Sequence, residues 1–528
     1  MSTNTGGSAV VQALRDNGVD TVFGIPGTHN LEIYRQLSAF SVRHVAPRHE
    51  QGGGYAADGY ARVTGRPGVC ITTTGPGLTN ISTAAGTAYG DSIPMLVISP
   101  GVPRGMEGAD VGWLHEVKDQ SGHMDRLLDR SVRVESPGEA YAAIDEAFAR
   151  WQVERPRPVH VEIPVDVLEE SWDGEARRAA PLSPPALDEA AVRAAGAALS
   201  SAQQPLLVLG GGAAGAAGAA VALAEALDAP VLTTVNGKGV VPENHPLSAG
   251  ASIRLAGAWA EIEAADAVLV VGSELGDSDL WGHQLRPKGT VIRVDIDERQ
   301  LQKNAPADST LHADAGAALT ALRAAAARTS AGEGGARAAK LRGTFAEQAA
   351  TDGGAWREVN EILASELPAD AIVAGDSAQV SYFGTVHFWP ASQPRQFIYP
   401  AGYATLGYGL PAAIGAKIAA PERTAAVLCG DGGFQFTALE LATAAAAAEG
   451  LCIPIVVMNN RGYAEIREEM DGLGIPRVGV DFDVVDFAAL GRACGGEGRT
   501  LDRLDQLPGA LREALSTPRP TVIEVPVG

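Results

Sequence analysis

The feature that most constrains the fold of this 528-residue chain is the regular alternation of short apolar runs with alanine-rich segments of helical length. The runs PLLVLG at 205–210, AVLVVG at 267–272 and PIVVMNN at 454–460 are apolar almost throughout, as expected of strands buried on both faces. The segments between such runs are long enough for a helix that crosses back over the sheet. The pattern therefore predicts an α/β fold built from doubly wound parallel sheets.

Two segments interrupt the alternation. Residues 169–190 are charged and then rich in proline, and residues 325–343 are rich in Gly, Ala and Arg without a strand pattern. We interpret both as interdomain linkers. Because 528 residues are too many for one core, we expect three domains, near 1–170, 185–330 and 350–528.

Charge and cysteine content restrict the class of partner. The chain has 63 acidic residues against 41 Lys plus Arg, a net charge of -22, which disfavours nucleic acid and anionic membranes as partners. No apolar run approaches the ~18 residues of a membrane span, and the N-terminus does not resemble a signal peptide. The four cysteines are scattered, which is typical of a reducing compartment. We therefore expect a cytoplasmic protein that acts on a small molecule.

Two successive predicted strands end in polar residues. Asp431 follows one strand, in GDGG, and Asn460 follows the next, 29 positions later. Carboxyl ends of parallel strands meet at one sheet edge, so these oxygen ligands should converge, and they suit Mg²⁺. Glycines 432 and 433 would let an anion approach the backbone, and Thr437 with Glu440 has the spacing of a capping box that starts a helix there.

The order of these motifs resembles thiamine-diphosphate-dependent enzymes, in the branch of acetolactate synthases and 2-oxo acid decarboxylases. The motifs GIPGTHN, RHEQGGGYAADGYAR, TTGPGLTN, DSIPMLVIS, ATLGYGLPAAIGA and GDG followed by NN carry the likeness over nearly the whole chain. The resemblance implies that the first domain binds the aminopyrimidine, the third binds the diphosphate, and the middle one is a Rossmann-like spacer.

The resemblance also implies roles for particular residues. Asp431 and Asn460 would be side-chain ligands of Mg²⁺, and the backbone carbonyl of Gly462 would be a third ligand. Other positions would contact the cofactor itself: Asp376 and Ser377 in AGDSAQ would help hold the diphosphate, and Ala404 and Leu406 lie in ATLGYG, where Leu406 would hold the cofactor in its bent form.

Glu50 has a role that explains its place beside a glycine run. In the resembling family, the glutamate here hydrogen-bonds a ring nitrogen of the aminopyrimidine and promotes loss of the thiazolium C2 proton. The role requires a carboxyl group surrounded by apolar groups, so that it holds a proton near neutral pH. The glycines after Glu50 would permit close approach of the cofactor.

Two histidines are further catalytic candidates. His115 takes the place of the glutamine in the Phe-Gln-Glu motif of acetolactate synthases, and would act as a proton donor or carboxylate anchor. His29 lies in the loop after the first predicted strand. Threonines 72–74 stand where benzoylformate decarboxylases have a histidine, which disfavours that activity.

The middle region contains a glycine pattern that invites a nucleotide-binding interpretation. Gly210, Gly212 and Gly215 form G-x-G-x-x-G after a strand, but the next strand, at 230–239, ends without the acid that would hold a ribose. The sequence 273–284 also lacks the RFDDR-like loop of acetolactate synthases. We therefore expect a packed spacer, with bound FAD unlikely.

The favoured function is a Mg²⁺-dependent 2-oxo acid decarboxylase, most like the 5-guanidino-2-oxopentanoate decarboxylases. A guanidinium would need acidic partners, and Glu465, Glu468 and Glu469 follow the metal loop, although a solvated helix face is the favoured interpretation of that cluster. The alternatives are an acetolactate synthase-type carboligase, a non-catalytic cofactor-binding protein and, least favoured, a nicotinamide oxidoreductase. The family implies a homodimer or a dimer-of-dimers tetramer whose sites are shared between chains.

Overall fold

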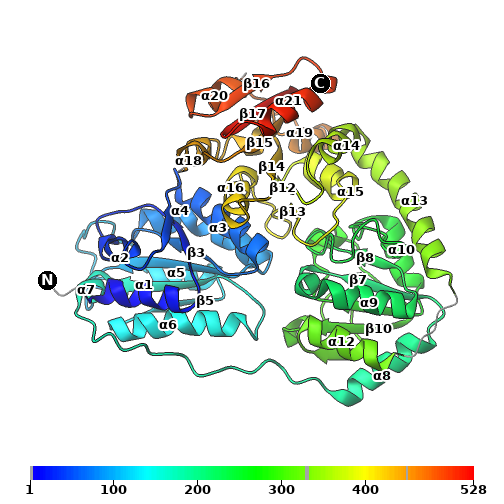
Figure 1. Cartoon of the computed structure of the whole chain (residues 1–528), viewed down its shortest axis with the longest axis horizontal. Coiled ribbons are helices and arrows are strands. Elements are labelled where there is room, and N and C mark those ends of the chain that lie inside the picture. Colours follow the sequence, from blue (N-terminus) through cyan, green and yellow to red (C-terminus); the bar gives the residue numbers. More distant parts are fainter. Residues whose placement is uncertain (1–3, 327–331, 448–449, 484, 528) are drawn as a thin grey trace.

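The computed structural model describes residues 4–527 except 327–331, 448–449 and 484. It contains three parallel sheets of six, five and six strands, each flanked by helices (Figure 1). Every pairing between neighbouring strands within these sheets is parallel, as the alternation of apolar runs and helical segments predicts. The α/β prediction with doubly wound parallel sheets is confirmed.

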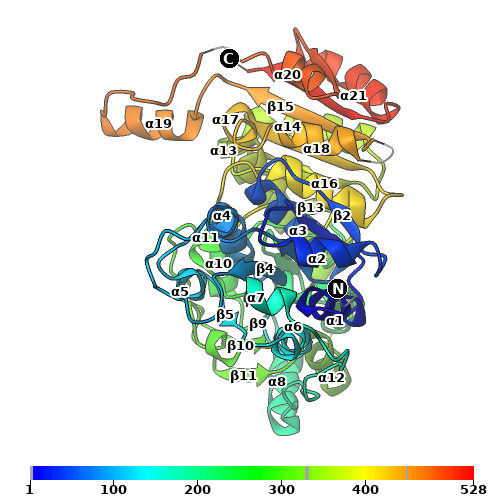
Figure 2. The same cartoon turned by 90° about the vertical axis from the view of Figure 1, so that its left-hand side faces the viewer.

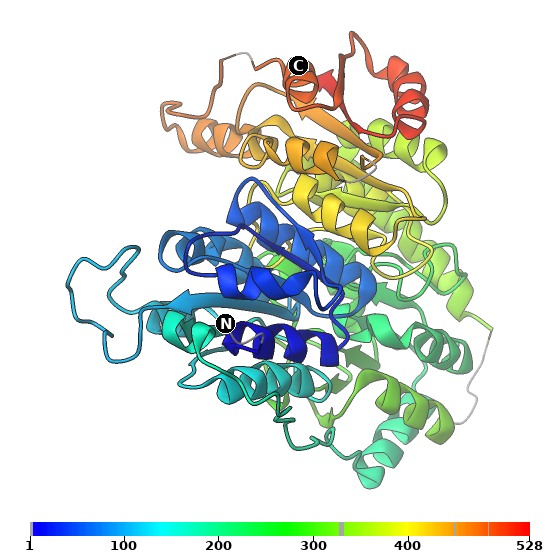
Figure 3. The same ribbon diagram turned by 60° about the vertical axis from the view of Figure 1, so that its left-hand side comes forward.

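The first sheet has the strand order β2-β1-β3-β4-β6-β5. Its strands, in that order, are Arg43–Val45, Thr21–Gly24, Gly68–Ile71, Met95–Gly101, Val159–Pro164 and Arg130–Arg133. Its helices are α1 Gly6–Asp16, α2 Leu31–Leu37, α3 Glu50–Thr64, α4 Pro76–Gly90, α5 Gln120–Leu127, α6 Pro137–Trp151 and α7 Val165–Glu169. Between β4 and α5 the chain extends away from this sheet (Figure 3).

The middle sheet has the order β11-β10-β9-β7-β8. Its strands, in that order, are Ser309–His312, Thr290–Asp295, Ala267–Val271, Pro205–Leu209 and Val231–Thr233. Its helices are α8 Glu189–Ser201, η1 Gly211–Ala216, α9 Ala217–Leu227, α10 Ala256–Ala264, α11 Asp277–Leu280, η2 Glu298–Gln300, α12 Ala315–Ala325 and α13 Gly334–Gly353.

The third sheet has the order β13-β12-β14-β15-β17-β16. Its strands, in that order, are Phe397–Ile398, Ile372–Gly375, Ala425–Gly430, Ile453–Asn459, Pro520–Pro526 and Glu497–Thr500. Its helices are η3 Gly354–Trp356, α14 Arg357–Glu366, η4 Val380–Thr385, α15 Val386–Phe388, α16 Gly409–Ala419, α17 Asp431–Phe434, α18 Glu440–Ala446, α19 Ala464–Leu473, α20 Phe487–Ala493, η5 Leu504–Gln506 and α21 Leu507–Leu515. Helix α19 projects from the body of the molecule (Figure 2) and buries none of its residues.

The two segments interpreted as linkers differ. Residues 170–188 contain no helix or strand beyond an isolated bridge from Ser171 to Thr5, and they run between the first and middle sheets (Figure 1). The interpretation of 325–343 as a linker is wrong for its second half, because α13 begins at Gly334. Leu341, Phe345 and Ala349 of α13 are buried against the middle sheet's helices. Residues 327–331 lie outside the described part of the chain.

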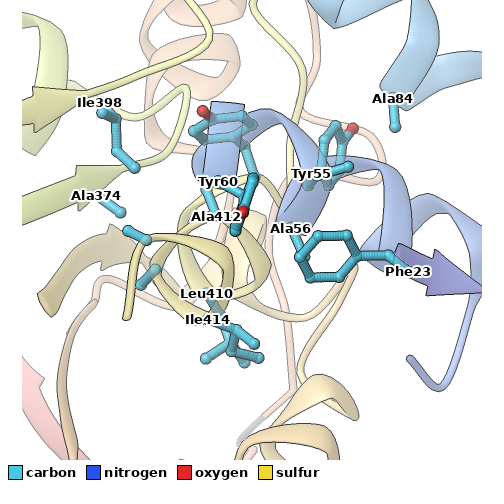
Figure 4. Close-up of a cluster of buried hydrophobic side chains, with 14 of the residues drawn as sticks. Phe23, Tyr55, Ala56, Tyr60, Ala84, Ala374, Ile398, Leu410, Ala412 and Ile414 are labelled. Carbon is cyan, nitrogen blue, oxygen red and sulfur yellow. The ribbon is translucent and has the colours of Figure 1, made fainter. Parts of the chain in front are cut away.

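The first and third sheets share one hydrophobic core. Helix α3 packs against α16, and Figure 4 shows side chains of both helices in one buried cluster, with Ala412 of α16 close to Tyr60 of α3. The helix backbones touch at glycines: a Cβ atom on Gly59 would collide with the Ala412 carbonyl, and one on Gly415 with the Ala56 carbonyl. This close contact joins α3, the helix that begins at Glu50, to α16.

Among the described residues, no helix has the length and apolar character needed to cross a membrane.

Candidate active site

The structure brings Asp431 and Asn460 together at the carboxyl edge of the third sheet. Asp431 follows β14 and is 2% exposed, and its carboxylate accepts hydrogen bonds from the backbone N–H of Asn460 at 3.4 Å and of Gly462 at 3.0 Å. Burial raises the pKa of Asp431, because a buried carboxylate loses its hydration. Removing that charge from water requires compensation, which a cation would supply.

Asn460 presents an oxygen that the protein leaves without a partner. Its Oδ1 atom is buried and accepts no hydrogen bond, an arrangement that costs free energy unless a ligand occupies it. The preceding residue, Asn459, faces elsewhere: its amide donates to Glu524 at 2.7 Å. One carboxylate, one unpartnered carboxamide oxygen and a nearby backbone fit Mg²⁺, which keeps several positions for water and phosphate oxygens.

Asp376 lies 1% exposed at the end of β12, beside this pair of residues. Its carboxylate accepts the backbone N–H of Ser377 at 2.9 Å and of Gly407 at 3.0 Å, and burial raises its pKa to about 6. Asp376 therefore organises the turn that precedes α16, whereas half-buried Ser377 lies nearer the surface. A Cβ atom on Gly433 would lie 2.8 Å from Asp376 Oδ2, so Gly433 permits this close packing.

The residues before α16 form an irregular turn. Ala404 is exposed and adopts the left-handed conformation with φ of 50°, and its N–H donates to the Pro400 carbonyl. Leu406 is half-buried, directly before Gly407, whose N–H reaches Asp376. Gly432 packs elsewhere, because its Cβ position is 2.8 Å from the ring of Tyr463.

Glu50 is the first residue of α3 and is only half-buried in the single chain. Its Oε2 atom accepts a hydrogen bond of 2.9 Å from the side-chain amide of Asn80, on α4. The apolar surroundings expected for this carboxyl are therefore not provided by one chain alone. A covering surface would have to come from the cofactor, from a second subunit or from both.

The start of α3 is held by the third domain. The Glu440 carboxylate accepts the backbone N–H of Arg48 at 2.9 Å and of His49 at 3.0 Å, and burial raises its pKa. The predicted capping box is wrong: α18 begins at Glu440 with Leu439 as its N-cap, and Thr437 donates to the Gly407 carbonyl instead. Glu440 is committed to a contact that fixes the residues immediately before Glu50.

The two candidate histidines lie together. Their rings are 5.2 Å apart, and the His29 ring lies 4.6 Å from that of Trp113. Burial lowers the pKa of His29, and the nearby His115 lowers it further. His115 has φ of 65°, and its Nδ1 atom is buried without a hydrogen-bond partner. An unpartnered ring nitrogen beside a second histidine makes this pair a candidate for proton exchange, and that role stays a prediction.

Comparison with known proteins identifies the family. Residues 4–123 match the N-terminal TPP binding domain of thiamine pyrophosphate enzymes, residues 192–322 the central domain and residues 378–525 the C-terminal TPP binding domain. The chain belongs to the thiamine pyrophosphate enzyme family.

The names of relatives that match this chain over nearly its whole length state two activities. The chain is 44% identical to the probable 2-ketoarginine decarboxylase AruI of Pseudomonas aeruginosa, over 99% of this chain and 94% of the relative. It is 34% identical to the acetolactate synthase large subunit of Parasynechococcus marenigrum, over 99% and 88%. It is 31% identical to the acetolactate synthase isozyme 1 large subunit of Escherichia coli, over 99% and 93%. The resemblance inferred from the motifs is confirmed.

The middle domain of this thiamine pyrophosphate enzyme is not a closed spacer. The glycine-rich turn lines a cavity of about 590 Å³, which Gly211, Gly212 and Gly215 share with residues of the other two domains. The expectation of a packed spacer is therefore wrong at this turn. Exclusion of FAD stays a prediction.

The sequence pattern does not reveal two residues that position the site. The spacing of Glu440 suggests a local helix cap, and no motif points to Gln120. Gln120 is 8% exposed; it accepts from the Thr74 hydroxyl and the Gly75 N–H, and it donates to Ser99 and Pro100. It thereby fixes the Gly75 turn, against which the His115 backbone packs. The signal was faint: an amide side chain directly after an Asp N-cap.

Proposed function

We propose that this thiamine-diphosphate-dependent enzyme catalyses the Mg²⁺-dependent, non-oxidative decarboxylation of a 2-oxo acid. The observation that carries the proposal is the buried Asp431 carboxylate beside the unpartnered Asn460 Oδ1, in a chain with both TPP binding domains. Thiamine diphosphate, when bound, supplies an electron sink for the pair left behind when CO₂ departs.

The residues of the chain would divide the remaining work. Asp431, Asn460 and the Gly462 carbonyl would hold the Mg²⁺ that neutralises the diphosphate. Glu50 would hold a proton at a ring nitrogen of the aminopyrimidine. His115 and His29, whose rings lie 5.2 Å apart, would anchor the substrate carboxylate or donate a proton to the reacting carbon.

The favoured substrate is 5-guanidino-2-oxopentanoate, and Glu465 is the candidate partner of its guanidinium. Glu465 is half-buried, and its Oε2 accepts from Tyr382 OH at 2.7 Å and from the Gln379 amide at 2.9 Å. Among the described ion pairs none includes Glu465, so its charge is oriented by neutral donors only. The interpretation of the whole cluster as a solvated face is therefore wrong for Glu465, although Glu468 and Glu469 are exposed.

A panel of 2-oxo acids tests the proposal. The holoenzyme is incubated with 5-guanidino-2-oxopentanoate, its uncharged analogue 2-oxoheptanoate and pyruvate; CO₂ is measured and the carbon products are identified by mass spectrometry. We expect kcat/KM for the guanidino acid to exceed that for pyruvate by roughly a hundredfold or more, since a desolvated carboxylate without its cation is costly. CO₂ release with acetolactate accumulating from pyruvate would instead favour the carboligase.

A matched pair of variants tests the role of Glu465. Glu465→Gln should reduce the preference for the guanidino acid over 2-oxoheptanoate by about tenfold or more, because a charge-assisted hydrogen bond is lost. Glu469→Gln, on the exposed side of the same helix, should leave the ratio unchanged. An unaltered ratio in Glu465→Gln would assign the substrate tail to another part of the site.

We also propose that the site is shared between the chains of a homodimer or of a dimer-of-dimers tetramer. The half-exposed Glu50 supports this, since the carboxyl lacks the apolar cover that its role requires.

A further inference from the structure

Arg254 carries a buried charge that forms no ion pair, although the more distant Asp352 carboxylate acts on it electrostatically. It is 8% exposed, its Nε donates to His387 Nε2 at 2.7 Å, and its Nη2 is buried without a hydrogen-bond partner. Among the described ion pairs none includes Arg254. Burial lowers the pKa of Arg254 to about 10, so it remains a cation at pH 7. Burial and neighbouring cations hold the pKa of His387 well below its usual range, so His387 is neutral, accepts the Arg254 Nε–H and adds no second positive charge.

The groups around Arg254 stabilise the cation but do not satisfy its free N–H groups. The guanidinium lies 4.8 Å from the ring centre of Trp281 and 4.9 Å from that of Phe383. Trp281 adopts the left-handed conformation with φ of 48°, which is rare for a bulky residue. Phe383 belongs to η4, a π-helix of six residues. Such strained backbone and π-helical turns concentrate at functional sites.

Arg254 lines a small cavity that adjoins the large one. The small cavity has a volume of about 30 Å³ and is also lined by Trp281, Tyr382 and Tyr399. Ser278 and Asp279 line both cavities, so the two are neighbours. About 30 Å³ holds only the charged end of a molecule, whose remainder would extend into the larger space.

The larger cavity has the opposite polarity. Two of its cations already form ion pairs: Arg62 pairs with Asp58 and Asp91, and Arg155 pairs with Glu274. In contrast, two of its acids, Asp295 and Asp314, form no ion pair within the described residues. Arg395 is the one cation of the lining without a described acidic partner, and burial lowers its pKa. A positively charged group is thus favoured in this space and an anion is favoured at Arg254.

We propose that the junction between the middle and third domains binds a small zwitterion. Arg254 receives its carboxylate in the small cavity, since the planar fork of a guanidinium matches a carboxylate, and its cationic end points into the acid-lined cavity. Tyr382 lines the small cavity and donates to Glu465, so the junction is in contact with the proposed tail site. Only this last connection rests on the proposed function.

Binding is measured on the holoenzyme by intrinsic fluorescence, because Trp281 stacks on Arg254. The probe is 5-guanidinopentanoate, which lacks a 2-oxo group and cannot react; pentanoate and pentylguanidine each carry one of its two charges. We expect a saturable change with 5-guanidinopentanoate, about tenfold weaker affinity for pentanoate and no change with pentylguanidine. Trp281→Phe identifies the signal, which must vanish in that variant.

Three substitutions make the proposal falsifiable. Arg254→Met should abolish the saturable signal, and Arg254→Lys, which keeps the charge but not the fork, should weaken affinity by about tenfold. Asp279→Asn should strengthen affinity at pH 8, because a like charge beside the carboxylate is removed. Glu465→Gln should retain the signal even if the decarboxylase assignment fails. Wild-type affinity in both folded Arg254 variants, or saturation by ADP but not by the zwitterion, would overturn the proposal.

Discussion

The first and third domains have the same strand order but present different chemistry at their carboxyl edges. Numbered within each domain, both sheets read 2-1-3-4-6-5. The third edge carries Asp376, Asp431 and Asn460, which are oxygen ligands. The first edge carries a different set: His29 follows β1, Glu50 begins the helix after β2, and the neutral Thr74 and Gly75 follow β3. We propose that one scaffold thus supports a site for a cation and phosphate and a separate site for an uncharged ring, and that the difference lies in a few strand-end residues.

Buried polar residues also join neighbouring strands inside both sheets. In the first, His160 on β6 is fully buried and bonds Ser99 on β4 and Ser131 on β5. In the third, Glu524 on the corresponding β17 accepts from Asn459 on β15 and from Thr500 on β16. Each sheet therefore has a buried polar residue that joins three neighbouring strands, and β6 of the first sheet also carries a buried acid, Glu162, which accepts from Arg133 on β5.

The largest effect is expected at the acidic edge. Asp431→Ala should lower Mg²⁺-dependent affinity for thiamine diphosphate by roughly a hundredfold or more, because the diphosphate and its surroundings lose the bridging cation. Isothermal calorimetry with and without Mg²⁺ measures this. Asp471→Ala, which removes an exposed carboxylate from α19, is the control and should retain affinity. Unchanged affinity in Asp431→Ala would remove the chemical distinction between the two edges.

Glu50→Gln tests the edge of the first sheet. The amide keeps the size of the side chain and its contact with Asn80 but removes the exchangeable acid, so cofactor should bind while C2 proton exchange slows by about 10²- to 10⁴-fold. Deuterium exchange followed by NMR after acid quench is the measurement. Gln51→Asn, one residue later on α3, provides the control. Exchange at the wild-type rate in Glu50→Gln would refute the proposed role.

Mixed dimers test whether the two edges work together across chains. Glu50→Gln and Asp431→Ala homodimers should each be nearly inactive. In a heterodimer one shared site carries both changes and the other carries neither, so about half of the wild-type activity should return. Differently tagged subunits are co-expressed and purified through both tags. Heterodimers as inactive as the parents, or an active monomer in sedimentation, would show that the edges of one chain serve each other.

The smallest effect concerns the buried residues that join the strands. Burial lowers the pKa of His160 to about 3, against 6.5 in an unfolded chain, so the folded state excludes a proton that the unfolded state binds. This contribution to stability is complete above pH 6.5 and is lost as the pH falls, by about 2 kcal/mol at pH 5. The thermal unfolding midpoint of the wild-type protein should fall between pH 7 and pH 5. In His160→Gln this fall should be smaller.

His312→Gln, at an exposed position, is the control for that measurement and should retain the wild-type pH dependence. An equal narrowing in both variants would mean that the acid sensitivity has a source other than His160.

The sequence predicted the third edge well, and the reason is geometric. Asp431 and Asn460 are 29 positions apart, but parallel pairing of β14 with β15 requires their strand ends to meet. The sequence could not predict the contacts that join residues far apart in the chain. Glu440 bonds the His49 backbone 391 positions away, whereas its local spacing resembled a helix cap.

Composition misled the prediction in a second way. Helix α13 is rich in Gly and Ala, like a linker, and yet Leu341, Phe345 and Ala349 recur every four residues and form a buried stripe. The surroundings of Glu50 raise a different problem, because the apolar cover that its role requires does not come from this chain alone. No pattern within one sequence contains that information.

The contact between α3 and α16 has a consequence for how this protein tolerates change. Where two helices touch through Gly59 and Gly415, the spacing between Glu50 and the turn before α16 depends on the absence of two methyl groups. Hydrogen bonds from Tyr408 to Asp58 and between Tyr55 and Thr405 hold the same contact. A single added carbon would move both helices apart and misalign two remote chemical groups together. The contact between α3 and α16 therefore fixes the distance between the two groups. We expect changes in α19 or in the cavities to accommodate new substrates more readily than changes in this contact.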